Sequence, residues 1–123
     1  MLKDIVLVAI GGSLGAISRF LLDVLWHANA LTLLANILGC FLLGTLVMYV
    51  KLKNINNQWV KPLIQTGFLG AFTSFSVLST YFYINIVSTS FSMVYFTFCL
   101  VAYFLLFLLG TIAAKVMVSA TRI

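Results

Sequence analysis

Four long apolar runs constrain this chain more than any other feature of its sequence. They cover residues 5–22, 31–50, 63–87 and 91–114. Arg19 interrupts the first run, and the other three carry no charge. A helix needs about 20 apolar residues to cross the hydrocarbon core of a bilayer. The pattern therefore predicts an all-α membrane protein, with four transmembrane helices in one domain over residues 1–123.

The composition excludes an ordinary soluble domain. Hydrophobic residues make up 63% of the chain and charged residues 7%, and the mean hydropathy is +1.20. The first run follows Met1 almost directly and has no clear small-residue cleavage site after it. We therefore expect this helix to be retained in the membrane and not removed as a signal peptide.

The basic residues predict the orientation of the chain. If four helices alternate in direction, six of the seven basic residues fall on one side of the membrane: Lys3, Lys51, Lys53, Lys61, Lys115 and Arg122. The positive-inside rule then places both termini in the cytoplasm of a cell whose plasma membrane holds the protein. The net charge of +5 is a signal of topology, and the scattered basic residues do not predict nucleic-acid binding.

The third run contains the segment most suited to an ion site. Its stretch GFLGAFTSFS, residues 67–76, places glycines, hydroxyls and phenyl rings inside a predicted span. Lipid tolerates an irregular backbone only where protein or water surrounds it. Gly67 and Gly70 would permit the third helix to break mid-membrane, and the hydroxyls of residues 73, 74 and 76 would supply donors and acceptors in the gap.

Three residues inside the runs each have two interpretations. Arg19 could attract an anion, or it could extend to the lipid headgroups from near the helix end. Asn36 could line a polar path, or it could make an interhelical hydrogen bond. Phe75 could present the positive edge of its ring to an anion, or it could be one of many packing aromatics. Chemistry alone leaves these alternatives open.

Three blocks, in this order and at these spacings, resemble the CrcB/Fluc family of fluoride channels. They are GGSLGAISRF (residues 11–20), NILGCFLLG (residues 36–44) and GFLGAFTSFS (residues 67–76). The third is the most specific, because it is similar to a family pattern of Gly-Phe-x-Gly-Gly-x-Thr-Thr-Phe-Ser-Thr-Phe. The resemblance spans nearly the whole chain.

The resemblance implies a fluoride-selective channel that exports cytoplasmic fluoride passively and is not an enzyme. It implies an antiparallel, inverted dimer with a structural Na⁺ at the interface between the subunits. By motif, the residues matching the family's fluoride pathway are Arg19 in the vestibule, Asn36, Phe75, Ser76 and Tyr95. Those matching its sodium site, through their backbone carbonyls, are Gly70 and Thr73.

Three departures from the family pattern affect the predicted ion path. Leu78 replaces the second pore phenylalanine, Val77 replaces a threonine, and Cys99 stands where a serine is common. A path made from two such subunits would be short of ligands. The strong charge bias also predicts one fixed orientation, whereas an inverted homodimer needs a nearly neutral bias. The sequence is therefore similar to one member of a heteromeric pair.

Two other functions were weighed from the sequence. A small multidrug-type transporter also has four helices, but it needs a membrane-embedded carboxylate. The only acids here are Asp4 and Asp23, at opposite ends of the first run, so this function is disfavoured. A non-conducting structural or assembly subunit of a heteromeric fluoride channel remains an alternative, because it would explain Leu78 and Val77.

Overall fold

The structure is a computed structural model that describes residues 1–26, 30–86 and 92–122. All the regular secondary structure in these ranges is helical, as predicted. The elements in chain order are α1 (Leu2–Trp26), α2 (Ala30–Leu52), η1 (Val60–Leu69), α3 (Gly70–Phe72), α4 (Phe75–Ile86) and α5 (Ser92–Thr121).

Three helices of the described chain are long and apolar enough to span a membrane. The qualifying segments are Leu2–Leu25 in α1, Leu33–Leu52 in α2 and Met93–Thr121 in α5. Each helix extends beyond the apolar run that predicted it. The remaining run, residues 63–87, is divided between η1, α3 and α4, so no single long helix corresponds to the third predicted span.

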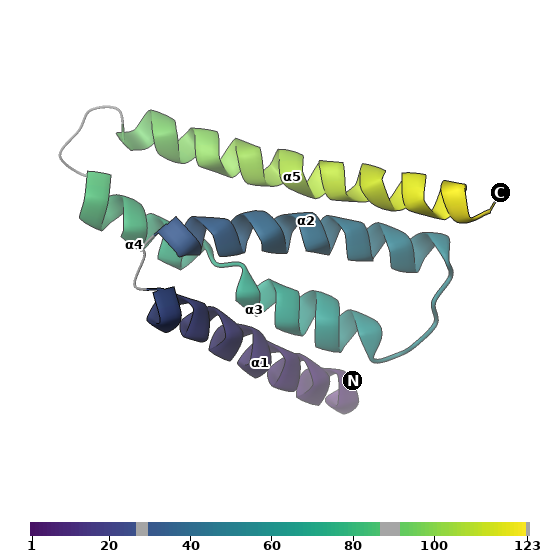
Figure 1. Cartoon of the computed structure of the whole chain (residues 1–123). Helices are drawn as coiled ribbons and strands as arrows, with labels where there is room; N and C mark the ends of the chain where they lie inside the picture. The colour runs from purple at the N-terminus through teal and green to yellow at the C-terminus, as the bar shows by residue number, and fades with distance from the viewer. Residues whose placement is uncertain (27–29, 87–91, 123) are drawn as a thin grey trace.

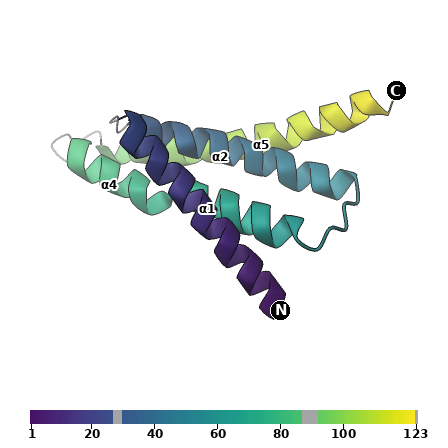
Figure 2. The same ribbon diagram turned by 60° about the horizontal axis from the view of Figure 1, so that its bottom comes forward.

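The helices pack in two main pairs, α2 with α5 and α1 with η1. Figure 1 shows the N-terminus, the C-terminus and the connection between α2 and η1 at the same end of the molecule. Figure 2 shows α1 crossing the other helices obliquely. Apart from Arg19, the Lys and Arg residues belong to the termini, this connection and the adjoining helix ends. We call this the basic end.

Glycines let α1 approach η1 closely. A Cβ added at Gly11 or Gly15 would overlap the backbone carbonyl of Leu63 or Phe68, respectively. From the other helix, a Cβ at Gly67 would lie 2.9 Å from the backbone carbonyl oxygen of Val8. Backbones this close leave no room for side chains, which is how small residues promote helix packing in membranes.

Glycines also let α2 and α5 approach each other closely. A Cβ at Gly44 would overlap the backbone of Phe107, and a Cβ at Gly110 would overlap the carbonyl of Phe41. Ala35, another small residue of α2, is 2% exposed.

The third run is broken, but not at its glycines. Gly67 lies within η1, and Gly70 is helical, with φ −62° and ψ −38°. The chain leaves the helix at Thr73, which is extended at φ −87° and ψ 138°, and α4 begins at Phe75. The expectation that Gly67 and Gly70 would form the break was therefore wrong in position. Gly67 serves close packing, whereas the break is held by side chains from α1 and α2.

Candidate functional site

Asn36 of α2 binds both backbone groups of Ser74 at the break. Its Nδ2 donates to the Ser74 carbonyl oxygen at 3.1 Å, and the Ser74 N–H donates to its Oδ1 at 2.9 Å. The side chain is 3% exposed. Of its two interpretations, the interhelical hydrogen bond is the one that the structure contains, and its partner is backbone. Asn36 thus satisfies polar groups that a broken helix would otherwise leave bare in apolar surroundings.

This pairing takes the usual helical donor away from the carbonyl of Gly70. In a continuous α-helix, the N–H of residue 74 would donate to the carbonyl of residue 70. Here that N–H faces Asn36, and the Gly70 oxygen has a long contact of 3.5 Å from Thr73 Oγ1. Gly70 is also exposed, and a Cβ there would meet only Gln65 O, at 3.8 Å. The backbone of Gly70 thus lies at the surface of the chain.

Thr73 adjoins Gly70 at the break and is anchored by α2 and by its own helix. Its N–H and its Oγ1 both donate to the Leu69 carbonyl oxygen, each at 3.1 Å. A Cβ at Gly39 would overlap the Thr73 methyl group, so the glycine on α2 makes room for this side chain. The two residues predicted for the cation site, Gly70 and Thr73, thus lie close together at the break, where Thr73 Oγ1 is 3.5 Å from the Gly70 carbonyl oxygen.

Arg19 points into the protein and does not extend to the surface. It is 6% exposed, and its Nη1 donates to the Phe72 carbonyl oxygen at 3.2 Å. This carbonyl ends the helix formed by η1 and α3, where a cation is favoured by the helix dipole. Asp23, one turn further along α1, acts electrostatically on the guanidinium. Within the described residues, Arg19 Nε and Nη2 are buried and have no hydrogen-bond partner.

Tyr103 of α5 belongs to the same interior region, and the sequence reasoning missed it. Its hydroxyl is buried and makes no hydrogen bond of ordinary length and angle within the described chain, although Asn36, Arg19 and Cys99 are close enough to act on it. A signal was present: Tyr95, Cys99 and Tyr103 recur every four residues, so they lie on one face of a helix. Buried O–H and N–H donors therefore gather beside the break.

Phe75 begins α4 immediately after the break and lies on the outside of the subunit. It is 61% exposed, and its ring packs edge-to-face with Phe96 of α5, with centroids 5.6 Å apart and an interplanar angle of 73°. Ser76 is also exposed, and its hydroxyl lies 3.1 Å from that of Ser74. These residues are placed at the first turn of α4, where unpaired N–H groups favour negative charge.

Tyr95 is also exposed and is linked to Phe75 through other rings. It is 53% exposed, and its ring contacts Phe82 at a centroid distance of 5.7 Å. Phe82 in turn packs edge-to-face with Phe96. The chain of contacts Phe75, Phe96, Phe82 and Tyr95 joins two of the predicted pathway residues.

The three departures from the family pattern occupy different environments. Leu78 is 1% exposed and is the largest fully buried side chain among the described residues, so it does not share the exposed position of Phe75. Cys99 is half-buried beside Tyr103. The side chain of Val77 lies outside the described part of the structure.

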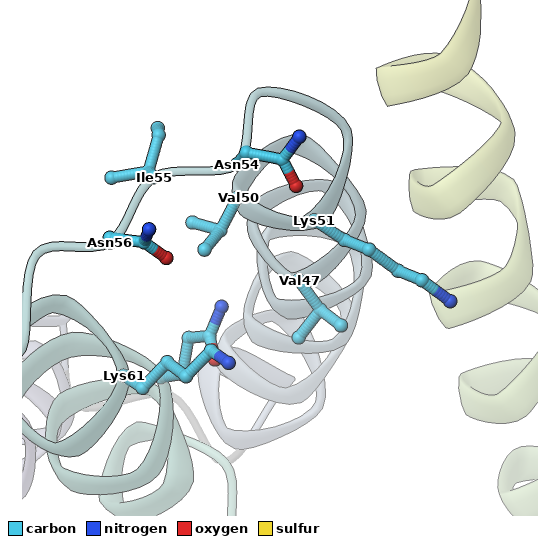
Figure 3. Close-up of a pocket in the computed structure, with 8 residues that line it drawn as sticks. Val47, Val50, Lys51, Asn54, Ile55, Asn56 and Lys61 are labelled. Atoms are coloured by element: carbon cyan, nitrogen blue, oxygen red, sulfur yellow. The ribbon is translucent and has the colours of Figure 1, made fainter.

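A separate pocket of about 370 Å³ lies at the basic end, between the end of α2 and the start of η1 (Figure 3). Its lining includes Asn54, Asn56, Lys61 and Gln65. Figure 3 shows the side chain of Lys51 extending towards α5 and away from Asn56. None of the predicted pathway or sodium residues lines this pocket, so the break and not the pocket is the candidate site.

Comparison with known proteins agrees with the motifs at the break. Over 82 residues the chain is 46% identical to a protein of Hahella chejuensis named fluoride-specific ion channel FluC, covering 61% of this chain and 64% of that protein. It is 42% identical over 80 residues to fluoride-specific ion channel FluC 1 of Bacillus cereus, covering 60% of this chain and 58% of the relative. The matched part thus spans less than two thirds of these relatives.

A family model covers more of the chain. The model described as CrcB-like protein, Camphor Resistance (CrcB), matches residues 6–116. This range includes α2, η1, α3, α4, most of α1 and most of α5, and with them every residue discussed at the break. The chain therefore belongs to the CrcB-like family.

Proposed function

We propose that this protein is a subunit of a fluoride-selective ion channel that lets cytoplasmic fluoride leave the cell passively across the plasma membrane. The observation that carries the proposal is the broken helix with the buried guanidinium of Arg19 beside it. A cation is costly in the interior of a membrane protein unless it has a function or a partner. The guanidinium here has one carbonyl partner and two donor nitrogens, Nε and Nη2, without a hydrogen-bond partner within the described chain.

Those donors suit a small anion that has lost part of its water. A fluoride ion must replace its hydration shell with hydrogen-bond donors or positive dipoles as it crosses. Arg19 and the Tyr103 hydroxyl supply donors in the interior, while Ser76 supplies a hydroxyl at the first turn of α4. The ring of Phe75 has a positive edge that can face an anion. We place the fluoride pathway along these groups and Tyr95, with Asn36 at the break.

A structural Na⁺ would fit the break at the carbonyl of Gly70. Unwound backbone carbonyls bind Na⁺ in the broken helices of transporters, and the Gly70 carbonyl is freed from its helical donor by Asn36. With Thr73, it offers hard oxygen ligands at an exposed position. Two carbonyls are too few to replace the hydration shell of an ion, so a second subunit would supply the remainder.

That second subunit is an antiparallel partner. It would cover the exposed face that carries Gly70, Phe75 and Tyr95 and complete both sites. The basic end concentrates Lys and Arg, which favours a single orientation with cytoplasmic termini. The partner is accordingly a related chain of opposite orientation, and the fourth crossing is made jointly by η1, α3 and α4. A channel makes and breaks no covalent bond, so the proposal assigns no catalytic residue.

Growth under fluoride stress tests the proposal in cells. A bacterial strain that lacks its own fluoride exporter would be supplied with this chain, with a related subunit from the same genome, or with both. We expect restored growth at toxic fluoride concentrations with both chains and weaker rescue with this chain alone. Full rescue by the related subunit alone, unaffected by adding this chain, would instead assign this protein no conducting role.

The alternative of a non-conducting assembly subunit has its own signature. The buried Leu78 offers no ring edge to an ion, so this subunit could complete the fold of its partner without lining a path. Under that alternative, rescue by both chains would survive replacement of Phe75, and only replacements that prevent assembly would abolish rescue.

A further inference from the structure

We infer that Asn36 is a positioning residue for the cation site, because it keeps the Gly70 carbonyl free to bind. This inference rests on the Na⁺ site put forward under the proposed function. It assigns Asn36 a role different from that of a fluoride ligand: its amide acts through the backbone of Ser74 on an oxygen that it does not touch.

The hydrogen bonds of Asn36 determine how its amide is oriented. Only its carbonyl oxygen can accept from the Ser74 N–H, and only its NH₂ group can donate to the Ser74 carbonyl. The distances of 2.9 Å and 3.1 Å fit this orientation. The neighbouring Gly39 lets α2 lie against Thr73, so the amide reaches the backbone from a closely packed helix. The two bonds to Ser74 and the close packing of α2 against Thr73 therefore fix the position of the Asn36 amide.

The backbone of the break has a competing arrangement. Without Asn36, the Ser74 N–H would lose its bond to Oδ1 and would need another acceptor, because backbone N–H groups inside a protein are almost always paired. The nearest acceptor in a regular helix is the carbonyl of Gly70. Bonding to it would extend α3 by one residue and occupy the oxygen proposed for Na⁺. Asn36 removes this competitor by supplying an acceptor of its own.

Arg19 has a parallel effect two residues before Ser74, at Phe72, but it does not substitute for Asn36. It binds the Phe72 carbonyl, which is already turned inward, and leaves the Ser74 N–H untouched. The two side chains thus have different roles at the break. Arg19 stabilises the end of α3, and Asn36 determines whether the Gly70 oxygen is available. Loss of Asn36 should weaken sodium binding specifically.

The test compares the melting temperature of the assembled channel in detergent, in sodium and in a bulky organic cation, for the wild type and for Asn36→Ala. A ligand that binds only the folded state raises its stability with concentration. We expect Asn36→Ala to raise the sodium concentration for half-maximal stabilisation at least tenfold. Asn36→Asp, which keeps an acceptor for the Ser74 N–H, should retain most of the response.

Thr45→Val is the matched control, because Thr45 also lies on α2 and bonds a backbone carbonyl, that of Phe41, but does not touch the break. It should change the melting temperature equally in both cations. An equal loss in both cations for Asn36→Ala, with an unchanged sodium response, would overturn the inference. If Asn36→Ala does not fold, the sodium responses of Asn36→Ser and Asn36→Asp are compared instead. Identical responses of these two variants would overturn the inference.

Fluoride flux measured on the same wild-type sample separates this inference from the proposed function. Normal fluoride flux without any sodium response in the wild type would overturn the cation site and the role of Asn36, and would leave fluoride conduction standing. A sodium response without fluoride flux would overturn the proposed function and leave the role of Asn36 intact.

Discussion

Replacing Gly11 with alanine should destabilise the subunit, whereas the same change at Gly12 should not. A Cβ at Gly11 would overlap the Leu63 carbonyl and lie 3.0 Å from the Phe68 nitrogen, whereas a Cβ at Gly12 would meet only the Gly67 oxygen, at 4.0 Å. Nonbonded heavy atoms pack at roughly 3.5–4.0 Å, so α1 would have to move roughly 1.5–2 Å away from η1 to relieve the overlap with the Leu63 carbonyl.

The two substitutions are adjacent in one helix, so their gains in helix propensity, about 1 kcal/mol each, cancel in the comparison. Overpacking a close contact costs about 1–3 kcal/mol. We therefore expect Gly11→Ala to be about 2 kcal/mol less stable than Gly12→Ala, roughly a 30-fold difference in the unfolding equilibrium.

Equilibrium unfolding in mixed micelles, followed by the loss of helical circular dichroism, measures this difference. Because Arg19 lies two turns further along α1, Gly11→Ala should also reduce fluoride flux by moving the guanidinium from the Phe72 carbonyl. Equal stability of the two variants would refute the close approach of α1 and η1 at Gly11.

Three further predictions concern topology, the ring edge and the break. A single cysteine at Asn54 should react only from the cytoplasmic face of intact cells; labelling from both faces would remove the argument for a fixed orientation. Phe75→Ile should reduce fluoride flux at least tenfold, while Phe72→Ile, whose ring stacks on Phe68 inside the subunit, should do much less; equal flux from both would remove Phe75 from the path. Gly70→Ala should not lower the melting temperature in the organic cation, because a Cβ there meets only Gln65 O, at an ordinary contact distance of 3.8 Å, but should weaken the sodium response; a large loss of stability without sodium would contradict this prediction.

The apolar runs predicted most of the helical structure because burial in lipid is a local property of the sequence. The runs 5–22 and 91–114 correspond to α1 and α5, which continue to Trp26 and Thr121. The extra turns contain charged or small residues, which hydropathy alone would assign to the loops between helices. The structure extends them because a helix satisfies its backbone groups along its whole length.

The break illustrates what the sequence could not specify. Glycine at 67 suggested freedom of the backbone, but it is used for the close approach to Val8 on α1. The chain breaks after Phe72, where Arg19 and Asn36 supply partners for backbone groups. These partners lie 53 and 38 residues away in sequence from the carbonyls they bind. Such pairings depend on how the helices pack, which no local pattern encodes.

The same reason explains the other differences at the site. Asn36 and Arg19 were each identified as candidates, because polar groups inside apolar runs are conspicuous. Their shared target was not, because it is backbone. Tyr103 was not predicted, because a single tyrosine within an apolar helix does not indicate a site. Its position is informative only once Tyr95 and Cys99 are seen to share its helix face. The segment η1 is a π-helix that includes Pro62. We identified no signal for this form in the sequence.

Fluoride efflux from liposomes would show whether this protein takes part in conducting fluoride. Vesicles loaded with potassium fluoride or potassium chloride would contain this chain alone, or this chain with a related subunit from the same genome, and an electrode would follow the anion released when a potassium ionophore is added. We expect rapid release of fluoride but not chloride from vesicles with both chains, with slower release from those with this chain alone. Fluoride release no faster than from protein-free vesicles in both preparations, or equal release of the two anions, would contradict this expectation.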